Sequence, residues 1–231
     1  MWQELCKTRE EYLERAKLDT KGYSPRRSET LLNDIEISPK VTREDTHRIK
    51  DLSNAFLYLV KCAQQRKRFS LDFIRDVSAK VMQHTGKEVY TTIGGYDTSL
   101  GDFRLGEEYY EEGILANYAQ IPDMLEQLCK ETNEKLGNVH DILTVKLAAD
   151  FHYRFMHIKP FGAGNITVGL LMMNYIQMMF REPLILIPGE DKAKYLAAIK
   201  MQKDTPTPET FERFVGEELL SQLRKEVTPR K

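Results

Sequence analysis

A short loop at residues 159–165, K-P-F-G-A-G-N, runs directly into an apolar stretch of helical character that reaches about Phe180. Gly162 and Gly164 allow the backbone to turn tightly and to bring several N–H groups close together. The first N–H groups of a helix have no partner within the helix, and here they point back at the loop. Such an arrangement suits a phosphate or a carboxylate. The loop is therefore a candidate anion-binding site.

A plainer interpretation is a corner between two helices, in which Gly and Pro only turn the chain. Composition alone favours this corner, because glycine-rich turns are commoner than phosphate-binding loops. The acid-base groups nearest to the loop are Lys159 within it and His152 and His157 before it. A lysine is protonated at neutral pH unless its pKa falls by several units, so Lys159 suits contact with an anion better than removal of a proton. We interpret His157 as a helix-end residue and His152 as a core residue.

The loop is flanked by the two most apolar helical patterns of the chain. Residues 139–158 present apolar side chains at helical spacing, so this helix is expected to be buried on a wide face. Residues 164–180 are apolar on nearly every side, which is typical of a helix at the centre of a bundle. The loop should therefore rest on a rigid support, where the two most buried helices meet.

The other segments are mostly helical by pattern. Thr42 and Asp45 form an acidic variant of the capping box at the start of one helix, and Ser70 caps the next. Further helices are predicted over residues 2–18, 28–37, 121–136, 191–202 and 209–225.

The helical period disappears between residues 88 and 116. Residues 89–93 are of strand type, and Gly94-Gly95 and Gly101-Asp102 are turn signals. We expect residues 103–106 and 109–110 to form the two short strands of a hairpin. The predicted fold class is therefore mainly α with one small β-hairpin, organised as an N-terminal helix and linker (1–27) and one larger domain (28–231).

The composition excludes several classes of protein. The chain has 231 residues, 41% of them apolar and 30% charged, and its formal net charge of −1 gives no reason to expect nucleic acid or an anionic membrane as a partner. The three cysteines, Cys6, Cys62 and Cys129, lack metal-ligand spacing, so no metal site is expected. The N-terminal segment is charged and no segment is long and apolar enough to cross a bilayer, so we expect a cytoplasmic protein.

Three sequence stretches together resemble the signature of the Fic family. They are H-Y-R-F at 152–155, K-P-F-x-x-G-N at 159–165 and L-M-M-N at 171–174. The family pattern is H-P-F-x-[DE]-G-N-G-R, preceded by a similar helix end and followed by a similar helix. The segment around Phe103-Arg104 resembles the family's flap, and residues 121–128 and 187–195 resemble the segments that follow the flap and the core. The resemblance extends from about Ser28 onward and implies a helical bundle with a small β-hairpin flap at about residues 88–116 and the motif loop at residues 159–167.

The resemblance also implies an activity. Fic proteins most often move AMP from ATP onto a hydroxyl of a target protein. The motif histidine is the general base, the acidic residue holds magnesium, the G-N-G backbone cradles the diphosphate, and the first arginine pairs with the terminal phosphates. The flap aligns the target segment as an added strand. In this chain the resemblance assigns phosphate contacts to Phe161, Gly162, Gly164 and Asn165, and the flap role to Phe103, Arg104 and Leu105.

The reacting side chains of the motif are absent. Lys159 stands at the histidine position, Ala163 at the acidic position, Ile166 at the second glycine and Thr167 at the first arginine. Alanine has no oxygen to offer magnesium, and threonine cannot replace a permanently charged, bidentate guanidinium. Glu36 occupies a place similar to the glutamate of the family's inhibitory helix, although its arginine partner would be Thr167 and an exposed helix-end charge is the better interpretation.

Our hypothesis from the sequence is a Fic-fold protein that has lost or nearly lost AMP transfer. It would act by binding a target or regulatory protein through the flap, and a nucleotide or another phosphate at the loop. No cofactor is assigned, because the ligand for the ATP-bound magnesium of the family is missing at Ala163. The alternatives are an active nucleotidyl or phosphoryl transferase with altered chemistry at Lys159, and a structural bundle without a ligand.

Overall fold

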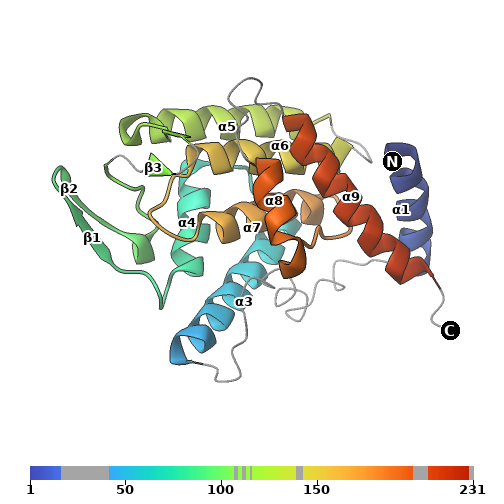
Figure 1. Cartoon of the computed structure of the whole chain (residues 1–231), viewed down its shortest axis with the longest axis horizontal. Coiled ribbons are helices and arrows are strands. Elements are labelled where there is room, and N and C mark those ends of the chain that lie inside the picture. The colour runs from blue at the N-terminus through green and yellow to red at the C-terminus, as the bar shows by residue number, and fades with distance from the viewer. Residues whose placement is uncertain are drawn as a thin grey trace.

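The computed structural model describes residues 1–16, 42–106, 109–110, 113–114, 116–138, 143–199 and 208–228. Glu36 and the helix predicted over 28–37 lie outside these residues. The described part is mainly α-helical, as predicted, and Figure 1 shows its arrangement. Its helices are α1 (Trp2–Ala16), α3 (Arg43–Gln64), α4 (Leu71–Val81), α5 (Ile121–Leu136), α6 (Leu143–Ile158), α7 (Asn165–Met179), α8 (Lys192–Ile199) and α9 (Pro208–Val227).

The predicted helix starts at Thr42 and Ser70 are confirmed. The Asp45 N–H donates to the Thr42 hydroxyl and the Thr42 N–H donates to the Asp45 carboxylate, which completes the capping box of α3. At α4 the Phe73 N–H donates to Ser70 Oγ at 3.1 Å. These caps satisfy N–H groups that the first turn of each helix leaves without a partner.

Helix α7 lies at the centre of the bundle, as its apolar sequence predicts. Nearly all of its residues are buried, and it packs against α6, α3 and α4. Tyr175 from α7 meets Phe73 from α4 with 4.9 Å between ring centroids, and Phe69 and Phe151 extend this aromatic cluster. On the other side, α9 packs against both α1 and α6 (Figure 1). Because both ends of α7 emerge from this core, the backbone at each end is held firmly.

The β structure differs from the prediction. Strand β1 (Glu88–Thr91) pairs antiparallel with β2 (Gly94–Asp97), and β3 (Tyr109–Tyr110) pairs with β4 (Gly113–Ile114). Residues 103–106, predicted as a strand beside 109–110, have no regular structure. The reason is that the Arg104 N–H donates to the Pro160 carbonyl and is thereby committed to the loop that precedes α7. Gly94, predicted in a turn, is the first residue of β2 and has a φ of 146°, which only glycine adopts readily.

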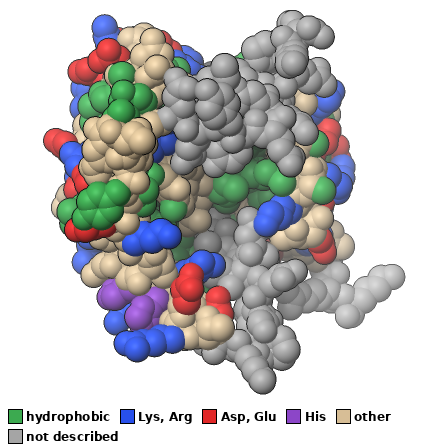
Figure 2. All heavy atoms as spheres, turned by 60° about the vertical axis from the view of Figure 1, so that its left-hand side comes forward, with side chains coloured by type: hydrophobic (Ala, Val, Ile, Leu, Met, Phe, Trp, Pro, Cys, Tyr) green, Lys and Arg blue, Asp and Glu red, His purple; other side chains and the backbone are tan. Residues whose placement is uncertain are grey.

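The β1–β2 hairpin projects from the helices at the left of Figure 1. Figure 2 shows the face that carries it, where basic, acidic and apolar side chains are interspersed and no sign of charge dominates the described part. None of the described helices has both the length and the apolar character required to span a bilayer.

Candidate functional site

The loop that joins α6 to α7 begins with a left-handed residue. The Lys159 N–H donates to the Phe155 carbonyl at 2.9 Å, and Lys159 has a φ of 46°. This is the backbone geometry in which glycine commonly ends a helix, and the proline that follows at position 160 prevents continuation. A lysine is strained in this geometry. The contacts around the C-terminal end of α6 must therefore hold the Lys159 backbone in place.

Asn165 holds the centre of the loop through its side chain. The Phe161 N–H donates to Asn165 Oδ1 at 3.0 Å, and Asn165 Nδ2 donates to the Phe161 carbonyl at 2.6 Å. The Phe161 ring is buried against Phe103 and Phe155, with centroid separations of 5.7 and 6.4 Å. The paired hydrogen bonds and the buried ring fix the loop between two helices that are themselves buried.

Gly164 opens α7 and leaves the helix N-terminus without a side-chain cap. It has a φ of 75°, and a Cβ at this position would lie 2.9 Å from Met82 Sδ. The backbone angle therefore favours glycine, and a side chain here would also displace the Met82 side chain. The Gly164 carbonyl accepts from the Val168 N–H, and as the N-cap residue Gly164 offers no side-chain acceptor to the N–H groups of the first turn. These N–H groups and the positive end of the helix dipole favour an anion.

Arg104 lies beneath the loop and is 1% exposed. Its guanidinium donates to the carbonyls of Lys159, at 2.8 Å, and of Ile158 at the end of α6. It also donates to the carbonyls of Gly106 and Ala116. The cation thus satisfies the carbonyl end of α6 and ties the segment after β2 to the loop. Arg104 was predicted to contact a target segment, which stays a prediction; in the structure its side chain is enclosed by the protein's own carbonyls.

The other two residues predicted for the flap are also drawn inward. Phe103 packs on Phe161, and Arg75 lies over its ring at 5.7 Å. The Leu105 side chain lies 3.3 Å from where a Cβ on Gly94 would be, so it contacts the turn end of the β1–β2 hairpin, where Gly94 pairs with Thr91. Phe103 therefore joins the segment after β2 to the loop, and Leu105 joins the same segment to the turn end of the hairpin.

Tyr96 of β2 covers the loop, which no sequence pattern had indicated. A Cβ placed on Gly162 would lie 2.4 Å from the Tyr96 hydroxyl oxygen and 2.8 Å from its ring. Gly162 is therefore needed for the close approach of this ring. The contact joins residues that are far apart in the sequence, so only the fold reveals it. Tyr96 places a polar group beside the candidate anion-binding loop.

The two histidines before the loop make contacts within the protein. His152 is fully buried, with Nε2 2.9 Å from the Tyr195 hydroxyl and its ring stacked on Phe211, and burial lowers its pKa to about 4. His157 donates from Nδ1 to the Tyr153 carbonyl within its own helix. The interpretations of His152 as a core residue and of His157 as a helix-end residue are both confirmed.

The loop does not fit a magnesium ion. Ala163 has no ligand atom, and the described residues contain no group of three or more His, Cys, Asp or Glu side chains that is placed to hold a metal. The side chains at the positions of the family's second glycine and first arginine are Ile166 and Thr167, both half-buried. The geometry therefore supports an anion contact through backbone N–H groups and offers neither a base nor a metal ligand.

Comparison with known proteins identifies related chains. Residues 68–177 match the model of the Fic/DOC family. The chain is 23% identical over 175 residues to the protein adenylyltransferase Fic of Drosophila erecta, and equally to that of Drosophila virilis. The match covers 75% of this chain and about a third of the length of these relatives.

Solved structures share the fold. A Fic-domain signalling protein from Bacteroides thetaiotaomicron has a TM-score of 0.66 at 19% identity, covering 98% of this chain and 92% of that one. Fic-1 from C. elegans has a TM-score of 0.69 at 17% identity, covering 97% of this chain and 70% of that one. IbpAFic2, in a structure where it is covalently tethered to Cdc42, has a TM-score of 0.62 at 12% identity over 93% of this chain and 70% of that one.

Proposed function

Residues 68–177 are a domain of the Fic/DOC family, and on this premise we propose that the chain is a Fic-fold binding protein without AMP-transfer activity. It would recognise a protein partner through the β1–β2 hairpin and an anionic group, such as the phosphate of a nucleotide, at the loop before α7. The observation that carries the proposal is a loop whose supporting contacts are intact while its reacting side chains are replaced.

The replaced side chains remove three separate contributions to catalysis. Lys159 in place of histidine leaves no neutral imidazole to take the proton of an attacking hydroxyl. Ala163 leaves no carboxylate for the metal that neutralises the phosphates, and Thr167 leaves no guanidinium to pair with them. One such loss would slow the reaction, and the loss of all three removes the means of performing it.

The supporting contacts of the loop are those that a binding site needs. Three features hold the first N–H groups of α7 in a fixed direction. They are the two hydrogen bonds between the Asn165 side chain and the Phe161 backbone, the buried Phe161 ring and the left-handed backbone of Gly164. These contacts do not depend on the lost side chains. Tyr96 over Gly162 would have to move or to donate its hydroxyl to the bound anion.

The hairpin has the features of a surface for a peptide segment. Tyr90 is 79% exposed and Ile93 50% exposed, and β1 and β2 pair only with each other within the described residues. A partner segment could therefore add as a strand, with its side chains against these two residues. Leu105 packs at the turn end of the hairpin beside Gly94, which helps to hold the strand edge in position.

A transfer assay tests the loss of activity. The protein is incubated with α-labelled ATP, magnesium or manganese, and candidate targets including itself, beside a variant carrying Lys159→His, Ala163→Asp, Ile166→Gly and Thr167→Arg. We expect no label transfer by the unmodified protein. Label transfer that Lys159→Ala abolishes would overturn the proposal in favour of a transferase with altered chemistry at Lys159.

A crosslinking experiment tests the hairpin. A photoreactive amino acid is placed at Tyr90, and a matched control places it at Leu196 on α8, which is also exposed at 44%. We expect a discrete crosslinked partner from position 90 that is lost when Ile93→Asp is added. Equal crosslinking from positions 90 and 196, or no effect of Ile93→Asp, would contradict a role for the hairpin.

A further inference from the structure

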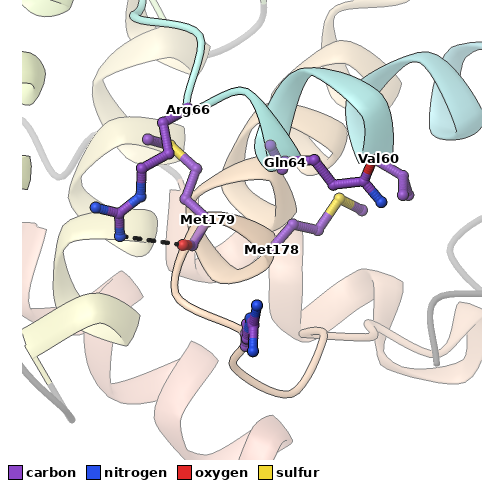
Figure 3. A pocket seen from close by; sticks show the side chains of 7 residues that line it. Val60, Gln64, Arg66, Met178 and Met179 are labelled. Atoms are coloured by element: carbon purple, nitrogen blue, oxygen red, sulfur yellow. Dashed lines mark hydrogen bonds between the residues drawn. The ribbon is translucent and has the colours of Figure 1, made fainter. Parts of the chain in front are cut away.

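A second pocket lies at the opposite end of α7 from the loop, between the C-terminal ends of α3 and α7 (Figure 3). Helix α7 has 15 residues, so the two sites are about 22 Å apart along it. The cavity has a volume of about 360 Å³, within the range of small-molecule sites. Its lining residues are Val60, Ala63, Gln64, Arg66, Met178, Met179 and Arg181.

The two arginines of this pocket both have a left-handed backbone. Arg66 follows α3 with a φ of 51°, and Arg181 follows α7 with a φ of 59°. Within the described residues only one other non-glycine residue has a positive φ, namely Lys159 in the loop. Glycine would take this conformation at each helix end without strain. Two arginines that keep a strained backbone and line the same cavity point to a use for their charge.

Interaction with the helix dipoles does not account for both charges. Each helix C-terminus carries about half a negative charge, so the ends of α3 and α7 together supply about one. Two guanidinium groups exceed this by about one positive charge. Glu182, the next residue after Arg181, forms an ion pair with Arg9 of α1 and does not neutralise the pocket. The described residues that line the pocket, which include two arginines and no acidic side chain, therefore carry a net positive charge.

The donors and the walls of the pocket define its ligand. Arg66 donates to the Met179 carbonyl at 3.5 Å (Figure 3). Its guanidinium also lies over the Phe180 ring and has further N–H groups that can donate to a ligand. Arg181 forms no side-chain hydrogen bond or ion pair with another residue of the described part. Val60, Ala63, Met178 and Met179 provide an apolar and adaptable wall.

We propose that this pocket binds a small organic anion, with a carboxylate or phosphate held by Arg66 and Arg181 and an apolar body against Met178 and Met179. The proposal is independent of the function assigned to the loop, because it uses different residues at the other end of α7.

Methyl NMR on protein labelled at the methionine methyl groups tests the proposal with a readout for each site. Met178 and Met179 report the pocket, and Met82, which lies against Gly164, reports the loop. The probes are octanoate, phenyl phosphate and inorganic phosphate, which separate a carboxylate source from a phosphate source and the anionic head from the apolar body. We expect saturable shifts of Met178 and Met179 with octanoate or phenyl phosphate, much weaker effects of inorganic phosphate, and no shift of Met82 that saturates in parallel.

The variants Arg66→Gly and Arg181→Gly each remove one positive charge, and glycine adopts the left-handed backbone at these positions without strain. We expect each to raise the Kd of the bound probe about tenfold or more, because a charge-assisted hydrogen bond is lost, while the melting temperature does not fall. Matched controls are Arg48→Ala, an exposed arginine at the far end of α3, and Lys159→Gly in the loop, and both should leave the Kd unchanged. If a glycine variant does not fold, Arg66→Gln with Arg181→Gln gives the same comparison.

Two results would overturn the proposal. One is the absence of saturable Met178 and Met179 shifts with both octanoate and phenyl phosphate at millimolar concentration. The other is binding that persists when both arginines are replaced, or that Lys159→Gly weakens to the same extent, because the anion would then lie elsewhere.

Discussion

The two ends of α7 are built in opposite ways. At the N-terminal end, Gly164 and the hydrogen bonds between Asn165 and Phe161 fix the loop that precedes the first N–H groups of α7. The reacting side chains of the family motif are replaced there. At the C-terminal end, charged side chains occupy positions where glycine would suit the backbone. The first end has its supporting contacts but lacks the reacting side chains of the family motif, and the second end carries charge at positions where the backbone is strained. This difference separates features that the fold requires from features that it merely tolerates.

The strongest test of the N-terminal end is removal of the Arg104 charge. Arg104→Met leaves four buried or partly buried carbonyl groups without this donor, so we expect a loss of about 3–5 kcal/mol in the free energy of unfolding. Urea unfolding followed by circular dichroism measures it. Arg68→Met, at an exposed arginine, is the matched control and should change the free energy of unfolding by less than about 0.5 kcal/mol. Equal effects of the two variants would show that Arg104 does not support the loop.

The second prediction concerns the buried imidazole behind α7. Burial lowers the pKa of His152 to about 4, whereas an unfolded histidine has a pKa near 6.5. Between these values the unfolded chain binds a proton that the folded protein excludes, so stability is lost as the pH falls from about 6.5 toward 4. The expected contribution of His152 is about 3 kcal/mol over this range, and none above it.

Urea unfolding at a series of pH values isolates this contribution. His152→Gln should flatten the slope of stability between pH 6.5 and 4, whatever its effect at neutral pH. His157→Gln is the control, since His157 is partly exposed at the end of α6. A slope that survives His152→Gln would assign the proton uptake to other groups.

The third prediction concerns the contact of Tyr96 with the loop. Gly162→Ala places a methyl group against the Tyr96 hydroxyl and ring, so the hairpin must shift, and we expect a cost of about 1–2 kcal/mol. In a Tyr96→Ala background the same substitution should cost less than about 0.5 kcal/mol, because the space is then open. Unfolding free energies of the four proteins in this cycle give the coupling directly. Additive effects would mean that Tyr96 does not lie on the loop in solution.

The sequence predicts those features whose physical cause is local. The caps at Thr42 and Ser70 and the central position of α7 follow from residues within a few positions of one another. The strand pairing of residues 103–106 was mispredicted because the Arg104 N–H, which a strand partner would have accepted from, donates to the distant Pro160 carbonyl. The burial of Arg104 and the approach of Tyr96 to Gly162 depend on segments that only the fold brings together. The left-handed backbone of Arg66 and Arg181 could not be predicted from the sequence either, because arginine disfavours that conformation.

The smallest expected effect compares the two ends of α7 directly. Replacing a left-handed residue with glycine relieves about 1–2 kcal/mol of strain and increases the entropy of the unfolded chain, so the net gain should be about 0.5–1 kcal/mol. Arg181→Gly should show this gain in full, since its side chain has no partner in the described part of the chain. Arg66→Gly should gain less stability, because it loses the hydrogen bond to the Met179 carbonyl and the contact with the Phe180 ring. Thermal and urea unfolding measure both, and Arg181→Ala, which keeps the strain, should give no gain. If Arg181→Ala and Arg181→Gly stabilise the protein equally, the gain comes from relief of repulsion between the two arginines and not from relief of backbone strain.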